Sequence, residues 1–196
     1  MTTAFLLDTC VISETTKKRP NENVIAFLET AENFYLPAGA LIELLTGITQ
    51  VCAVDPIKAV RLSNWYHQLM RQNIPIVETG RDVIEIMGVL AADPRLRNLW
   101  EPRRDGAGRP VGKPRGGQDV HIAAAALARR LPIATMNTRD FLAIDELYPL
   151  PGIYNPQTNT WHRKMEPLAE RFPLHVRPPQ SGDQIDFETV LEPKNP

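Results

Sequence analysis

Short apolar runs alternate with longer periodic segments along most of the chain. The apolar runs predict buried strands at Ala4 to Leu7, Phe34 to Leu36, Ile74 to Val77, Leu131 to Thr135 and Ile153 to Pro156. The periodic segments predict helices around 24–28, 37–45, 57–72, 82–90 and 122–127, and the third has a core-facing stripe of Val60, Trp65, Leu69 and Met70. Because strand and helix alternate, the pattern favours an α/β domain with a mostly parallel sheet.

The stretch from Gly117 to Phe141 is the most informative about a site. A glycine-containing loop ends at Asp119, which we predict to be the N-cap of the next helix. That helix is rich in alanine, so its backbone can pack closely against a sheet. After the short strand that follows, we expect Asp140 in a loop beyond the carboxyl end of the strand, where open α/β sheets bind their ligands.

Two further acidic residues are expected at the same edge of the sheet. Asp8 directly follows the first strand, and Glu43 lies on the helix predicted after Pro37. Carboxylates that converge repel one another unless protons or a cation offset their charge, and oxygen-rich sites suit Mg²⁺ or Mn²⁺. The same residues also allow simpler interpretations, in which Asp8 caps a turn and Glu43 is a partly exposed side chain on an amphipathic helix.

The segment from Asp93 to Gln118 is rich in Arg, Pro and Gly, and it predicts a long insert without regular structure. It leads directly to Asp119, so its cations could hold the phosphates of a nucleic acid beside the acidic edge. A solvated linker would have the same composition. The candidate substrate-binding residues of this insert are Arg103, Arg104 and Arg109.

The 196-residue chain has a formal net charge of −1, which excludes a general electrostatic attraction to nucleic acid. We divide it into one domain over 1–156, which includes the insert over 93–118, and a Pro-rich C-terminal extension over 157–196 that either wraps the domain or is partly disordered. The sequence has no apolar run typical of a membrane span and no basic start typical of a signal peptide, so we expect a cytoplasmic protein that does not enter a membrane. Its two cysteines, Cys10 and Cys52, fit a reduced compartment.

Several competing classes of protein lack their motifs in this chain. No GxGxxG supports dinucleotide binding, and no HExxH, CxxC or GxSxG indicates another metal or hydrolytic site. A phosphatase of the haloacid dehalogenase type needs a second acid two residues after Asp8, where Cys10 stands. A response-regulator receiver needs paired acids near the first strand and a later Lys, and neither is evident.

Four blocks of the sequence resemble the motifs of PIN-domain toxins, and they follow the family's order. The blocks are Phe5-Leu-Leu-Asp8-Thr9-Cys10-Val11-Ile12-Ser13-Glu14, Leu41-Ile42-Glu43-Leu44-Leu45-Thr46-Gly47-Ile48, Asp119 with Ile122 to Ala128, and Thr135-Met136-Asn137-Thr138-Arg139-Asp140-Phe141. Asn155-Pro156 is similar to the family's usual terminus. The resemblance spans residues 4–156 and is strongest to the VapC and FitB-like ribonuclease toxins of bacterial toxin-antitoxin pairs.

The resemblance implies a PIN-like three-layer α/β/α sandwich around a short, mostly parallel sheet. It implies that Mg²⁺, or Mn²⁺, is held by Asp8, Glu43, Asp119 and Asp140, with Thr9, Thr135 and Asn137 as supporting polar residues. The implied activity is metal-dependent endonucleolytic hydrolysis of RNA. The implied partners are a second copy of the chain, as a homodimer, and a small antitoxin through which the complex reaches DNA. A non-catalytic PIN-like module in a DNA-bound complex is the alternative.

The chain also departs from the family's pattern. Cys10 stands where the family usually has Asn, which predicts the loss of a hydrogen bond near Asp8. Pro37 lies near a position that is often Ser. The basic insert is longer than usual, and the extension after Pro156 is additional.

Overall fold

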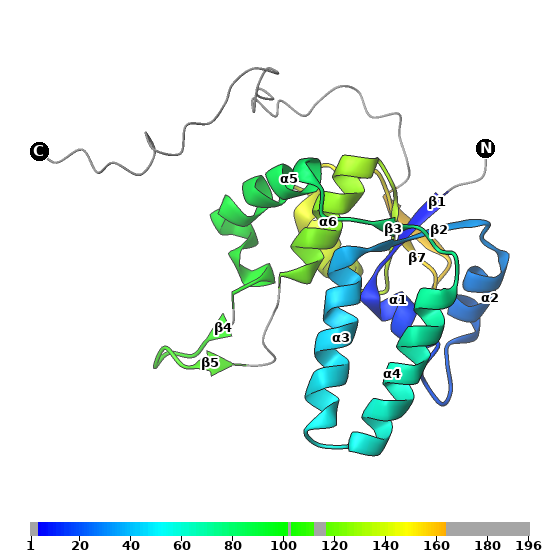
Figure 1. Cartoon of the computed structure of the whole chain (residues 1–196). Helices are drawn as coiled ribbons and strands as arrows, with labels where there is room; N and C mark the ends of the chain where they lie inside the picture. The colour runs from blue at the N-terminus through cyan, green and yellow to red at the C-terminus, as the bar shows by residue number, and fades with distance from the viewer. Residues whose placement is uncertain (1–3, 102, 112–116, 164–196) are drawn as a thin grey trace, which may run out of the picture.

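The structure is a computed structural model that describes residues 4–101, 103–111 and 117–163 (Figure 1). Within these ranges the main sheet consists of β1 (Ala4–Leu7), β2 (Asn33–Pro37), β3 (Ile76–Val77), β6 (Ile133–Ala134), β7 (Ile153–Asn155) and β8 (Thr160–Arg163). The α-helices are α1 (Thr9–Glu14), α2 (Glu22–Thr30), α3 (Ala38–Cys52), α4 (Pro56–Arg71), α5 (Arg81–Ala92), α6 (Gln118–Arg129) and α7 (Thr138–Asp145). None of the helices in these ranges is long and apolar enough to cross a membrane.

The main sheet confirms the predicted α/β class. Its strand order is β3-β2-β1-β6-β7-β8, and every pairing is parallel except the antiparallel pair of β7 and β8. Leu6 of the central strand β1 is in register with Tyr35 of β2 on one side and with Ile133 of β6 on the other. In Figure 1, α2 lies on one side of the sheet and α5 and α6 lie on the other, so the chain forms three layers.

Helix α6 is buried along most of its length. The run from Ala123 to Ala126 has no exposed surface, and the helix contacts α3, α5 and α7. Small side chains let the helix backbone approach these neighbours closely. The position of α6 between α3 and α7 matters for the site, because each of these three helices carries one of the predicted acids.

A cluster of aromatic rings packs between α2 and the sheet. The ring of Phe27 in α2 lies 5.2 Å from Phe5 of β1 and 5.3 Å from Tyr154 of β7, measured between centroids. Trp161 of β8 lies 5.1 Å from Tyr154 and 5.6 Å from Phe5. Strand β8 therefore attaches the start of the C-terminal extension to the domain. The remainder of the extension, 164–196, lies outside the described residues.

The predicted core-facing stripe of α4 is only partly correct. Trp65 and Leu69 pack against the core, but Val60 is 62% exposed and Met70 is 37% exposed. Helix α4 packs against α3 in a hairpin that projects from the sheet (Figure 1). Because this hairpin has one covered side, fewer residues of α4 are buried than its periodicity predicts.

The prediction of an insert without regular structure is wrong for the described part of that insert. A 3₁₀ helix, η1 (Pro94–Leu99), follows α5, and β4 (Arg103–Arg104) pairs antiparallel with β5 (Pro110–Val111). The carboxylate of Asp105 accepts hydrogen bonds from the backbone N–H groups of Ala107 and Arg109, which stabilise the turn between the two strands. Residues 102 and 112–116 lie outside the described ranges.

Candidate active site

The four acids predicted for the site lie on four different helices or at their starts. Asp8 follows β1 at the N-terminus of α1, and Glu43 lies within α3. Asp119 lies in the first turn of α6, and Asp140 lies in the first turn of α7. Two local predictions are wrong: the N-cap of α6 is Gly117 rather than Asp119, and Asp140 lies in a helix because α7 begins before it.

Asp8 is buried, with 3% of its surface exposed, and two side chains donate hydrogen bonds to it. The Sγ of Cys10 lies 2.9 Å from Asp8 Oδ2, and the Oγ1 of Thr135 lies 2.6 Å from the same oxygen. Burial raises the pKa of Asp8 above its ordinary value, although both hydrogen bonds act to lower it. The predicted loss of a hydrogen bond near Asp8 is therefore wrong, because the thiol of Cys10 supplies one.

Glu43 is connected to this buried carboxylate through the start of α1. Glu43 is an exposed residue, but its carboxyl group is partly buried. Thr9 Oγ1 holds this group by donating a hydrogen bond of 2.7 Å to Glu43 Oε2. Burial raises the pKa of Glu43, and the negative charge of Asp8 raises it further. The charge of Asp8 therefore lies close enough to Glu43 to disfavour its ionised form.

The segment after β6 connects Asp8 to Asp140. The hydroxyl of Thr135, which donates to Asp8, also accepts a hydrogen bond of 2.8 Å from the backbone N–H of Asn137. The side-chain Nδ2 of Asn137 in turn donates to Asp140 Oδ2 at 3.1 Å. The three supporting residues that the sequence singles out, Thr9, Thr135 and Asn137, thus each contact one of the predicted acids or link two of them.

The start of α6 is fixed by two close backbone approaches. Gly117 has a positive φ of 69°, and a Cβ at this position would lie 3.0 Å from the Cβ of Trp100. A Cβ on Gly39, in the first turn of α3, would lie 2.5 Å from Nδ1 of the buried His121. The other ring nitrogen of His121 lies 2.8 Å from Thr79 Oγ1. Glycine at position 39 therefore sets how closely the helix of Glu43 approaches the helix of Asp119.

The chemistry of these side chains fits a hard divalent cation. Asp8 and Glu43 are neighbouring carboxylates whose pKa values are both raised, and a bound cation would offset the charge that burial and repulsion disfavour. Within the described ranges, however, no three His, Cys, Asp or Glu side chains are gathered closely enough to hold a metal ion. Of the four predicted acids, Asp8 and Glu43 are neighbours through Thr9, and Asp140 is linked to Asp8 through Thr135 and Asn137.

The three predicted substrate-binding residues lie on the small hairpin of the insert. The backbones of Arg103 and Arg104 form β4. Arg109 precedes β5, and its side chain is 78% exposed. Its Nε lies 2.8 Å from Asp105 Oδ2, so an ion pair offsets part of its charge. The hairpin projects from the body of the molecule near the start of α6 (Figure 1).

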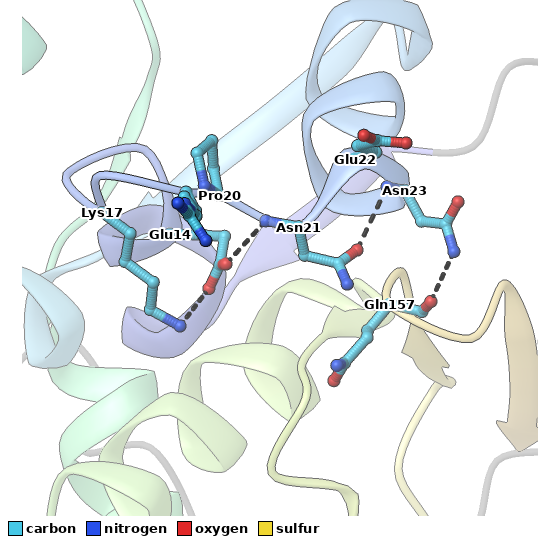
Figure 2. A pocket seen from close by; sticks show the side chains of 8 residues that line it. Glu14, Lys17, Pro20, Asn21, Glu22, Asn23 and Gln157 are labelled. Atoms are coloured by element: carbon cyan, nitrogen blue, oxygen red, sulfur yellow. Dashed lines mark hydrogen bonds and ion pairs between the residues drawn. The ribbon is translucent and has the colours of Figure 1, made fainter.

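A separate polar cavity of about 530 Å³ lies between the end of α1, the start of α2 and the turn before β8 (Figure 2). Within it, the buried carboxylate of Glu14 accepts from the backbone N–H of Asn21 at 2.8 Å and forms an ion pair with Lys17 at 2.6 Å. Asn23 Nδ2 donates to the backbone carbonyl of Gln157 at 2.8 Å. None of the predicted site residues lines this cavity. Its polar contacts connect the end of α1 to the start of α2, and the start of α2 to the turn before β8.

Comparison with known proteins agrees with this architecture. The model of the PIN domain family matches residues 5–147, which is more than half of the chain. The curated protein Toxin FitB from Neisseria gonorrhoeae is 31% identical over 160 residues, and the match covers 81% of this chain and 99% of that protein. The chain belongs to the PIN-domain family, and its relatives there include the FitB toxin.

Two solved structures give the same assignment in three dimensions. The structure of FitAB bound to an IR36 DNA fragment superposes with a TM-score of 0.53 at 26% identity, covering 81% of this chain and 99% of that one. The crystal structure of FitAcB from Neisseria gonorrhoeae gives a TM-score of 0.51 at 28% identity, covering 78% and 97%. The predicted resemblance and the predicted fold class are thereby confirmed.

The contact between Gly39 and His121 is a feature of the site that the sequence did not reveal. A histidine within a run of small apolar residues, and a glycine in the first turn of an otherwise apolar helix, are the available signals. Neither feature predicts that Gly39 and His121 are in contact, because the two residues lie far apart in the sequence. Burial lowers the pKa of His121, which favours the neutral ring, and its Nδ1 has no hydrogen-bond partner in the described part of the chain.

Proposed function

We propose that this protein is the toxin of a toxin-antitoxin pair and that it hydrolyses phosphodiester bonds in RNA with the help of Mg²⁺ or Mn²⁺. The observation that carries this proposal is the pair of Asp8 and Glu43, two carboxylates brought together by Thr9 with both pKa values raised. Such a pair is costly in a protein without a cation to offset its charge. The similarity to Toxin FitB supports the toxin role.

Four acids would hold the cation in this proposal, namely Asp8, Glu43, Asp119 and Asp140. When bound, a divalent cation supplies Lewis-acid chemistry to phosphate oxygens and to water. The residues around the acids restrict their motion: Thr135 holds Asp8, Thr9 holds Glu43, and Asn137 holds Asp140. Restrained carboxylates present their charge to a cation and a phosphate without reorganising first.

The proposed partners are RNA as the substrate, a small antitoxin, and a second copy of the chain. The similar structure described as FitAB bound to a DNA fragment supports a complex that reaches DNA. For this chain we propose that DNA contact is indirect and is made by the antitoxin. We propose a cytoplasmic location, where RNA is available as a substrate.

Removal of divalent metal is expected to abolish RNA cleavage, and Mg²⁺ or Mn²⁺ is expected to restore it. Protons compete with the cation for Asp8 and Glu43, whose pKa values are raised, so metal affinity should fall as the pH is lowered. The decline should begin above the ordinary titration range of Asp and Glu. Cleavage of labelled RNA, measured against Mn²⁺ concentration at several pH values after EDTA treatment, tests both expectations.

Cleavage that persists undiminished in EDTA would remove the metal from the mechanism. A protein that binds Mn²⁺ and RNA at neutral pH but cleaves no RNA would favour the non-catalytic binding module instead.

Changing Arg103, Arg104 and Arg109 together to Ala is expected to weaken RNA binding. Each phosphate contact on a single strand adds roughly 0.7 to the slope of log affinity against log salt, so the slope should flatten by up to about 2. The loss should be smaller if the ion pair with Asp105 occupies Arg109 in the complex as well. Binding is measured on an Asp8→Asn background, which prevents cleavage, while cleavage at saturating RNA is measured without that change.

A triple variant of exposed cations elsewhere is the matched control. Replacing Lys18, Arg19 and Arg61 by Ala removes the same formal charge from other parts of the surface. An equal loss of affinity in both triple variants would show that net charge matters and that the hairpin has no specific role.

A further inference from the structure

We propose that Cys10 is a positioning residue, whose single sulfur atom joins Asp8 to the segment after β6 so that the two parts of the candidate site move as one unit. The inference rests on the proposed function, because it assigns Cys10 a part in presenting Asp8 to a cation. It also gives a physical role to the position at which this chain departs from the Asn usual in its family.

The thiol acts first as a hydrogen-bond donor. Cys10 Sγ lies 2.9 Å from Asp8 Oδ2, the oxygen that also accepts from Thr135 Oγ1 at 2.6 Å. Because the two side-chain donors approach one oxygen from two different chain segments, they restrict rotation of the carboxylate about its Cβ–Cγ bond. The orientation of Asp8 therefore depends on both donors.

The same sulfur atom also acts as an acceptor. The backbone N–H of Met136 donates to Cys10 Sγ at 3.2 Å. Thr135 Oγ1 lies 3.6 Å from the same sulfur, but its proton is donated to Asp8, so this approach is a contact and not a second hydrogen bond. The parallel strands β1 and β6 are already in register through Leu7 and Ala134, so Cys10 continues their connection beyond the ends of the strands. The side chain of Cys10 makes this connection beyond the last backbone hydrogen bonds between the two strands.

The two roles of the thiol complete a network that extends to the fourth acid. Met136 is followed by Asn137, whose backbone N–H donates to Thr135 and whose side chain donates to Asp140. A change at Cys10 therefore acts on Asp8 directly and on Asp140 through this segment. Residues that orient metal-binding side chains in this way typically change metal affinity by about 10–100-fold when they are removed.

The chemistry of the side chain predicts an order among substitutions. Asn carries a separate donor and acceptor, so it can replace both contacts of the thiol. Ser also has a donor and an acceptor on one atom, but its shorter bond to Cβ leaves that atom farther from both partners. Ala has neither group. Mn²⁺ affinity and protection of the Met136 amide should therefore be highest with Cys or Asn at position 10, lower with Ser and lowest with Ala.

The experiment compares the full-length wild-type protein with Cys10→Asn, Cys10→Ser and Cys10→Ala. Mn²⁺ affinity is measured by calorimetry without RNA, and exchange of the Met136 amide hydrogen is measured by NMR without metal. Cys10→Ala should weaken Mn²⁺ binding about tenfold or more. It should also speed exchange of the Met136 amide about fivefold, the size expected for one hydrogen bond. Cys10→Asn should restore most of both.

Cys52→Ala is the matched control, because Cys52 is an exposed cysteine on α3, and it should change neither measurement. A purely structural role for Cys10 predicts a lower melting temperature in Cys10→Ala with unchanged Mn²⁺ affinity of the folded protein, and this result would overturn the inference. Unchanged exchange at Met136 would overturn it as well. If the wild-type protein binds no Mn²⁺, the proposed function fails, and the amide exchange then decides alone whether Cys10 joins the two segments.

Discussion

Replacing Asp8 or Asp119 by Asn is expected to lower the rate of RNA cleavage by about a thousandfold, which corresponds to about 4 kcal/mol of transition-state stabilisation. Asn keeps the shape of the side chain and removes its negative charge, so the cation loses a ligand while the fold is retained. For Asp8, burial already disfavours the ionised form, which makes loss of the charge tolerable for folding. Single-turnover cleavage at saturating Mg²⁺ measures the effect, with circular dichroism as the test of folding.

Glu29→Gln is the control for this pair of variants, because it removes an exposed carboxylate from α2. It should leave cleavage unchanged. If either purified and folded Asn variant cleaves RNA at the wild-type rate, that acid has no part in the chemistry and the four-acid assignment is wrong.

Gly39→Ala is expected to lower the free energy of unfolding by about 1–3 kcal/mol, the range typical of an overpacked interior. The added Cβ would lie 2.5 Å from Nδ1 and 2.9 Å from Cγ of His121, so α3 must move away from α6. Because these helices carry Glu43 and Asp119, the movement should also weaken metal binding and slow cleavage. Chemical denaturation and Mn²⁺ titration measure the two effects.

The chain offers a matched control for this change on the same helix. Gly47 also lies within α3, and a Cβ there would meet nothing within 4 Å, so Gly47→Ala should stabilise the protein by about 0.5–1 kcal/mol. Adding His121→Ala to Gly39→Ala should recover part of the lost metal affinity, because it removes the ring that the new methyl group contacts. Failure of this double variant to improve on Gly39→Ala would show that the distance between α3 and α6 is not what the glycine sets.

Local patterns predicted the elements of this fold well because the hydrophobic periods of helix and strand differ clearly along the chain. The strand before Asp8, the helix after Pro37 and the alanine-rich helix are all present where they are predicted. The wrong predictions concern features that depend on packing between elements and not on the local sequence. Burial of α4 depends on the projecting hairpin that it forms with α3, and periodicity alone cannot show that one side of such a hairpin is left uncovered.

The sequence proposes a set of residues for the candidate site, but it contains no information about the contacts between them. The order of motifs along the chain singles out the acids, and the order of the strands brings them towards one edge of the sheet. The contacts of Cys10 with Asp8 and Met136 depend on distances across two strand ends, which no local pattern contains. Family resemblance alone predicted a missing hydrogen bond at that position, because it compares residue types and carries no information about what a thiol can reach.

The antiparallel pairing of β8 with β7 determines what this sheet presents to other chains. Strand β7 is hydrogen-bonded on both sides, to β6 and to β8, and the outermost strand on that side is the segment Thr160–Arg163. A chain shortened to end at Pro156 would lack this cover, and the free backbone N–H and C=O groups of β7 would become a template for strand addition. The short strand just beyond Pro156 therefore covers β7 and becomes the outer edge of the described sheet in its place, so a partner that adds a strand on this side must pair with β8.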